Sequence, residues 1–156
     1  MKGAGFLIAP TNPKPYAQCV RDYRGGGGTF EPMTISECYC RIDELKLLGR
    51  DWDSYDAEAP NFIALSRLKR CVAIAETLGM QPRTLVPSPE GGAAYVAACG
   101  RVSADIEFFN VGDVAAITAV GGKMDVWELA VEPDLDAEIE ASLVKIDAFL
   151  KANGVR

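Results

Sequence analysis

Polar and apolar side chains alternate strictly through residues 101–109. The polar members are Arg101, Ser103, Asp105 and Glu107, and apolar residues stand between them. A period of two places the two sets on opposite faces of a β-strand, whereas helical periodicity would scatter the charges around the whole helix. The pattern therefore predicts a half-buried antiparallel strand with one solvent-exposed face and one apolar face.

Neighbouring segments extend this strand into a predicted meander. Three of them have the length and composition of strands, at residues 93–99, 113–120 and 123–129. Glycine-containing turns separate the segments, and Gly121-Gly122 has the length of a two-residue hairpin turn. Residues 82–89 are rich in proline, so we expect an extended lead-in to the sheet in which Leu85 and Val86 pair only briefly.

Helical periodicity appears on both sides of the meander. Apolar residues recur at intervals of three and four over residues 35–48, 61–78 and 133–154. Thr34 and Glu37 have the spacing of a capping box at the start of the first helix. The sequence therefore predicts a single α+β domain at residues 34–156, in which three helices cover one face of a four-stranded antiparallel meander in the order α-α-β-β-β-β-α.

Residues 1–33 differ from the rest of the chain in composition. Several prolines and the run Gly25–Gly28 prevent a long helix, so we expect an irregular Pro/Gly-rich arm. The glycine run lacks the Lys-Ser/Thr pair of a phosphate-binding loop, and no strand leads into it. We interpret it as a flexible linker.

Charge narrows the range of partners. The 156 residues carry a formal net charge of -6, divided into +2 for residues 1–33 and -8 for the remainder. An acidic body repels phosphate backbones, so we do not expect direct binding of nucleic acid. The same charge would suit a basic protein surface, or would simply keep the protein soluble. No apolar run approaches roughly 18 residues, so we expect no membrane span.

Cysteine and histidine usage bears on catalysis and on the cell compartment. The chain has five cysteines and no histidine, which excludes catalytic triads that need imidazole. The cysteine spacing fits neither a zinc site nor a disulfide framework. We therefore expect reduced, mostly buried thiols in a cytoplasmic protein, and no cofactor.

The most acidic stretch of the chain runs from residue 51 to residue 58. Its carboxylates, which are candidate oxygen ligands for a hard cation such as Mg²⁺ or Ca²⁺, belong to Asp51, Asp53, Asp56 and Glu58. The stretch is not an EF-hand, because Tyr55 and Asp56 stand where that motif needs an oxygen ligand and a glycine. We favour a structural connector in which Trp52 and Tyr55 pack inward while the acids cap helices and face solvent.

Several short motifs together resemble a group of small uncharacterised bacterial and phage proteins. The group has a Trp-Asp-x-Tyr-x-Ala loop, a helix, and a Pro-x-x-x-Gly-Gly lead-in to a small sheet. The matching residues are Asp51–Ala57, Ala59-Pro60, Val86-Pro87-Ser88 and Gly91-Gly92, within a span from about Leu45 to Phe109. This chain has Asp56 where such loops commonly have glycine, so its turn is expected to differ. The resemblance supports the fold and brings no established activity with it.

These observations favour a small acidic, non-enzymatic module that binds another protein, as a regulator or inhibitor of bacterial or phage origin. The residues that we consider candidates for the interaction are Arg101, Ser103, Asp105, Glu107, Asp51, Trp52 and Tyr55. A solvated strand face is the default interpretation of the first four. An unpaired strand edge or the N-terminal arm is also a candidate route to a homodimer.

The alternative hypothesis is a divalent-metal-dependent enzyme that acts on phosphoester or glycosyl substrates. Asp51, Asp53 and Asp56 would hold the metal ion, with Glu58 or Asp105 as a further ligand. The two hypotheses differ in geometry, because a metal site requires these carboxylates to converge, whereas a connector directs them to solvent or to its own backbone.

Overall fold

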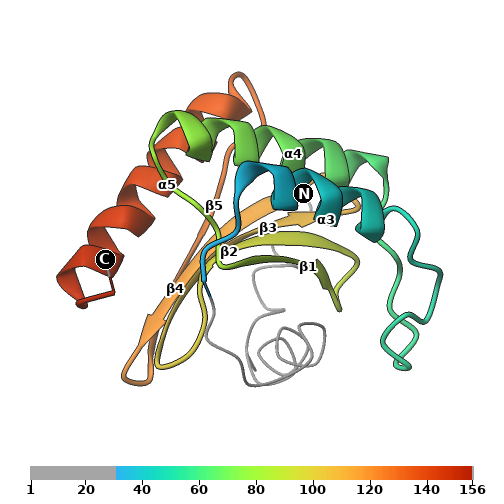
Figure 1. Cartoon of the computed structure of the whole chain (residues 1–156), viewed down its shortest axis with the longest axis horizontal. Helices are drawn as coiled ribbons and strands as arrows, with labels where there is room; N and C mark the ends of the chain where they lie inside the picture. Colours follow the sequence, from blue (N-terminus) through green and yellow to red (C-terminus); the bar gives the residue numbers. More distant parts are fainter. Residues whose placement is uncertain (1–30, 156) are drawn as a thin grey trace.

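The computed structural model describes residues 31–155. Residues 1–30 of the predicted arm therefore lie outside the described residues. Helices and strands follow one another in the order α3 (Ile35–Leu45), α4 (Phe62–Thr77), β1 (Thr84–Ser88), β2 (Gly92–Ala98), β3 (Val102–Phe109), β4 (Val114–Val120), β5 (Lys123–Glu128) and α5 (Leu135–Ala152). The α+β class predicted from the sequence is confirmed. Figure 1 shows the three described helices together on one side of the sheet.

The sheet has five strands in the order β1-β2-β3-β4-β5, and every neighbouring pair is antiparallel. The predicted four-strand meander is therefore correct for β2 to β5 but lacks β1. Residues 121 and 122 form the β4–β5 hairpin, and their positive φ values of 58° and 80° are typical of the glycine pair found there.

Strand β1 escaped prediction because its sequence carries no alternation. All five of its residues are buried, so polar Thr84 and Ser88 do not mark a solvent-exposed face. Pro87 also argues against a strand, since proline cannot donate a hydrogen bond to a neighbour. It is tolerated here because β1 is an edge strand, paired only with β2.

Side-chain caps fix the starts of α3 and α4, and the capping box of α3 is the one predicted from the sequence. Thr34 and Glu37 exchange both hydrogen bonds of a capping box at the start of α3, and Asn61 caps α4 by accepting a hydrogen bond from the Ala64 N–H. Helix α3 ends at Leu45, three residues before the predicted end. No helix within residues 31–155 has both the length and the apolar character needed to cross a membrane.

The main hydrophobic core lies between the helices and the sheet. Helices α4 and α5 contribute Leu68 and Leu143, while β2 and β3 contribute Tyr95 and Phe108, all fully buried. Helix α5 is joined to β5 by a hydrogen bond of 3.0 Å, which the Trp127 Nε1–H donates to Ser142 Oγ. Burial of this amount of aromatic and aliphatic surface is the main source of stability in a domain of this size.

The opposite face of the sheet is also buried over its central strands. Val86, Ala94 and Val96 form a second small apolar cluster there, although no helix within residues 31–155 packs on this face. Asp105 and Glu107 share this face, because they pair with Val96 and Ala94 across the β2–β3 ladder. They are 7% and 5% exposed, so the predicted solvent-exposed face is wrong at these two positions.

Candidate functional site

The acidic loop between α3 and α4 is held together by its own carboxylates. Asp51 Oδ1 accepts a hydrogen bond of 2.7 Å from the Asp56 N–H, and Asp53 Oδ1 accepts bonds from the N–H groups of Tyr55 and Ala57. The Asp51 N–H donates to the Ala57 carbonyl oxygen, which closes the loop at its base. Short aspartate side chains favour such local bonds to the backbone in turns.

Three residues of this loop adopt left-handed backbone conformations. Asp51, Ser54 and Asp56 have φ values of 61°, 64° and 65°. Non-glycine residues rarely adopt this region, and when they do the surrounding structure must hold them there. Here the aspartate hydrogen bonds do so, and Asp56 also forms an exposed ion pair with Arg50.

The two aromatic residues of the loop have different environments. Trp52 is partly buried, and its Nε1–H donates a hydrogen bond of 3.3 Å to the Glu58 carbonyl oxygen. Tyr55 is 88% exposed. The prediction that both rings pack inward is therefore wrong for Tyr55. The Tyr55 and Ala57 N–H groups both donate to the Asp53 side chain, and this tight turn directs residues 54–56 out into solvent.

The loop carboxylates do not gather around a common point. No group of three acidic, cysteine or histidine side chains within residues 31–155 is arranged to hold a metal ion. Asp51 and Asp53 direct oxygens to the loop backbone, while Asp56 faces Arg50. Glu58 lies apart, within 4 Å of the position that a side chain at Gly91 would occupy. The arrangement gives the metal hypothesis no support.

A pair of asparagines joins this loop to the β3–β4 turn. The Asn61 N–H donates to Asn110 Oδ1 at 2.8 Å, and Asn61 Nδ2 donates to the Asn110 carbonyl oxygen at 2.9 Å. Asn110 Nδ2 in turn donates to the Ala59 carbonyl oxygen at 2.9 Å. These bonds connect segments 49 residues apart and fix the start of α4 against the sheet.

Large apolar side chains are exposed at the end of the molecule that this link organises. They are Leu47 (85% exposed), Tyr55 (88%), Phe62 (84%) and Val111 (81%), and we refer to these four residues as the loop-end surface. Phe62 and Val111 directly follow the two bonded asparagines. Figure 1 shows the α3–α4 connection, the start of α4 and the β3–β4 turn at the same end of the molecule.

Sequence reasoning names Tyr55 as an interaction candidate but does not name Leu47, Phe62 and Val111, which are equally exposed. The available signal was the position of Phe62 and Leu47 outside the apolar stripes of their helical segments. A single exposed apolar residue is ordinary, and only the fold shows that these four lie at one end.

The other predicted interaction residues lie along β3 and its start. Arg101 is exposed and Ser103 is partly buried, whereas Asp105 and Glu107 are inside. Ser88 Oγ donates a hydrogen bond to Glu107 Oε1. Asp105 Oδ1 is buried and has no hydrogen-bond partner among the described residues. The four side chains therefore do not form one accessible row.

Burial changes the acidity of the two inner carboxyl groups. Desolvation raises the pKa of Glu107 to about 7; the hydrogen bond from Ser88 partly opposes this rise, and the charge of Glu90 adds to it. Desolvation, followed by repulsion from Glu107, raises the pKa of Asp105 well above its usual value. Near neutral pH Glu107 therefore retains part of the proton that an exposed carboxylate would have lost.

Two thiols lie in the core, as expected for small buried residues. Cys38 on α3 and Cys71 on α4 are 1% and 0% exposed. Burial raises the pKa of Cys38 to about 11 and raises the pKa of Cys71 further. Because the thiolate is the reactive form, both groups are poor nucleophiles in the folded protein.

No family model, no characterised protein and no solved structure matches this chain.

Proposed function

We propose that this chain is a small acidic protein-binding module, of the regulator or inhibitor kind, which docks on its partner through the loop-end surface. The observation that supports this most directly is the exposure, above 80%, of all four of its large apolar side chains at one end of the molecule. When a partner removes such a group of aromatic and aliphatic side chains from water, the free energy of the complex is lowered.

The loop around Tyr55 has the properties of a preformed contact. Its backbone is fixed by the Asp51 and Asp53 hydrogen bonds and by the Asn110 link, so little conformational entropy would be lost on binding. Tyrosine is one of the residue types enriched at interaction hot spots. The geometry therefore favours Tyr55 and Phe62 as the anchoring side chains.

Charge indicates the chemistry of the partner. The loop from residue 50 to residue 58 carries four carboxylates and a single arginine, in a chain of net charge -6. A complementary surface would carry basic residues around an apolar centre, since matching charge steers association and disfavours other partners. Binding to such a surface should weaken as salt is added.

The experiment uses the full chain as bait in a lysate of its source organism, followed by reconstitution with the purified partner. We expect one stoichiometric, basic partner. The double variant Tyr55→Ser/Phe62→Ser should bind it at least about thirtyfold more weakly, because two hot-spot contacts are removed. The matched control is Val144→Ser, which changes a residue 54% exposed on α5 and should bind like the original chain.

Two outcomes would contradict the proposal. In the first, the double variant retains full affinity for a partner that binds stoichiometrically, so the contact lies elsewhere. In the second, sedimentation shows that the chain alone is a dimer and that the double variant is a monomer. The loop-end surface would then be an interface between copies of this chain.

A further inference from the structure

The face of the sheet opposite the helices is buried over one half only. Strand β1 has a neighbouring strand on one side only, yet Thr84, Val86 and Ser88 on this face are all 0% exposed. On β5, the other edge strand, Met124 stands on the same face and is 38% exposed. Neighbouring strands alone therefore do not account for the burial of β1, and a cover over β1 to β3 does.

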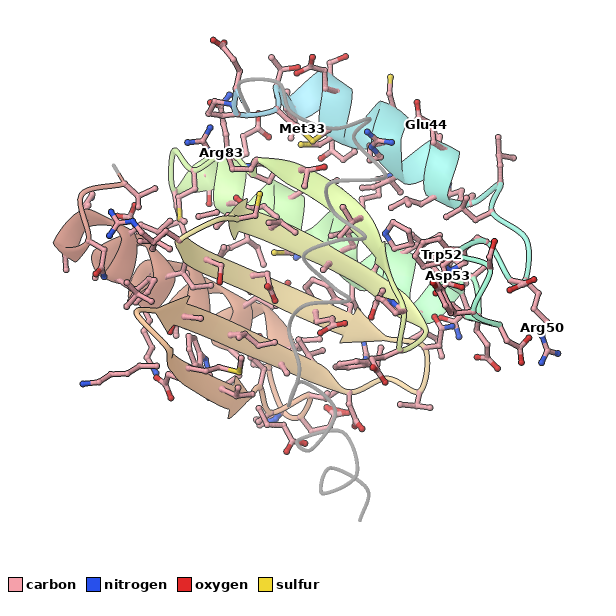
Figure 2. All side chains as sticks on the ribbon, turned by 90° about the horizontal axis from the view of Figure 1, so that it is seen from below. Met33, Glu44, Arg50, Trp52, Asp53 and Arg83 are labelled. Carbon is pink, nitrogen blue, oxygen red and sulfur yellow. The ribbon has the colours of Figure 1, made fainter. Side chains whose placement is uncertain are left out.

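No described helix supplies this cover. The apolar cluster of Val86, Ala94 and Val96 has Cys99 as its partly buried apolar neighbour within residues 31–155. The helices pack on the other face, which carries Tyr95. Figure 2 views the second face directly and shows the strands in front of the described helices. The cover therefore has to come from outside residues 31–155.

The covered face is acidic and has no basic side chain of its own strands. Asp105 and Glu107 stand on it, and Glu128 on β5 continues the same row. Lys123 is the one basic residue within the five strands, and it stands on the helix side because it pairs with Val120. Asp105 Oδ1 is buried without a hydrogen-bond partner among the described residues. Such a face suits a cover that brings positive charge as well as apolar groups.

We propose that the N-terminal arm, residues 1–30, docks on this face and seats Phe6–Ala9 over the cluster of Val86, Ala94 and Val96. Residues 6–9 form the longest apolar run of the arm, which suits the apolar part of the face. The arm has a single acidic residue and four basic ones, which are Lys2, Lys14, Arg21 and Arg24. Its charge is therefore opposite to that of the face. The contact does not depend on the proposed protein-binding function.

The described chain starts beside the covered half of the sheet. The Met33 N–H donates a hydrogen bond of 2.8 Å to the Pro82 carbonyl oxygen, two residues before β1 begins. Figure 2 shows Met33 and Arg83 toward the same edge of the sheet. The arm therefore joins the domain next to β1, where the burial on the second face is complete.

The length of the arm is sufficient for the contact. Thr84 pairs with Val96, which pairs with Asp105, so a spacing of about 4.8 Å between strands places Asp105 roughly 10 Å from β1. Residues 25–30 alone can span about 20 Å when extended. The run Gly25–Gly28 also permits a sharp change of direction around the sheet edge.

The test uses NMR of the full chain, with a soluble gadolinium chelate as the probe of exposure. We expect weak paramagnetic relaxation of the Val86 and Val96 methyl groups, and strong relaxation of the Met124 methyl group on the same face. Nuclear Overhauser effects should connect the two valines with protons of residues 6–9. In the variant Leu7→Asp/Ile8→Asp the contact should be lost, because carboxylates would be buried against an apolar and acidic surface. Relaxation of the two valines should then rise to the level of Met124.

The matched control is Leu47→Asp/Val111→Asp, which adds the same charge at two exposed apolar positions of the loop-end surface. The two valines should stay protected in it. Three results would overturn the inference. In the first, the valines of the original chain are relaxed as strongly as Met124, so the face is open. In the second, their protection is lost on dilution, so a second copy of the chain is the cover. In the third, the Leu7→Asp/Ile8→Asp variant protects them as well as the control does, so residues 6–9 do not cover them.

Discussion

Backbone conformation at Asp51, Ser54 and Asp56 shows how single residues shape the acidic loop. Each has a φ between 61° and 65°, where most L-residues are strained. Aspartate tolerates this region better than most, since its short side chain bonds the nearby backbone. Asp56 has a conformation that glycine adopts without strain.

A comparison of alanine with glycine at position 56 tests this account. Both Asp56→Ala and Asp56→Gly remove the exposed ion pair with Arg50, so that loss cancels between them. We expect Asp56→Ala to have the lower free energy of unfolding, by about 1 kcal/mol, because only alanine is strained at a φ of 65°. Urea denaturation followed by circular dichroism measures the difference.

Asp43 provides the matched control. It is an exposed, ion-paired aspartate within α3, where the backbone is helical. Asp43→Ala should there be the more stable variant, by about 1 kcal/mol over Asp43→Gly, because glycine disfavours a helix interior. The same order of stability at both positions would show that residue 56 is not held in a left-handed conformation in solution.

At the level of elements, the Asn61–Asn110 pair joins the start of α4 to the β3–β4 turn. Its hydrogen bonds link chain segments 49 residues apart. Sequence periodicity cannot reveal such a link, because asparagine is favoured both as a helix cap and as a turn residue without any distant partner. For this reason Phe62 and Val111 were not recognised as neighbours at one end, although the helix and the turn themselves were predicted.

Removal of the Asn110 side chain should loosen the acidic loop. Asn110→Ala loses the bonds to the Asn61 N–H and the Ala59 carbonyl oxygen, so we expect a stability loss of roughly 1–3 kcal/mol. Amide hydrogen exchange of residues 50–60 should also become faster. Asn153→Ala, which removes a C-cap bond at the far end of α5, should leave exchange in this loop unchanged. Equal exchange in both variants would contradict a role for Asn110 in ordering the loop.

An element could be predicted from the sequence when one of its sides is exposed to solvent. Helices α3, α4 and α5 have one apolar and one solvated side, so their periodicity is visible in the sequence. Strand β1 has no solvated side, and its five buried residues leave no alternation to detect. The sequence predicts an inward Tyr55 because aromatic residues in connectors usually pack, and the local hydrogen bonds that turn it outward are not visible in the sequence.

At the scale of the whole molecule, the sheet is buried on both faces at its centre. Strand β3 has the most regular alternation in the chain, yet Asp105 and Glu107 are only 7% and 5% exposed. The alternation correctly separated the two faces, because Ile106 and Phe108 pack toward the helices. It could not show that the polar face is covered as well, since carboxylates are almost always solvated.

The cost of burying Glu107 should appear as a dependence of global stability on pH. Its pKa is about 7 in the folded protein, against an ordinary value of 4.5. The folded state therefore binds more protons than the unfolded state between these values, and the free energy of unfolding falls as the pH rises from 4.5 to about 7. The decline from this group amounts to about 3 kcal/mol, and above pH 7 its contribution is constant.

Urea denaturation of the full chain at a series of pH values between 4 and 8 measures this decline. Glu107→Gln keeps a partner for the Ser88 hydroxyl but cannot ionise, so its stability should fall much less over the same interval. A residual fall is expected from Asp105, whose pKa is raised by the same burial. In Glu128→Gln, which changes an exposed position on β5, the free energy of unfolding should fall with rising pH as much as in the original chain. If Glu107→Gln and the original chain lose stability in parallel, Glu107 is accessible to solvent, and the second face of the sheet is open in solution.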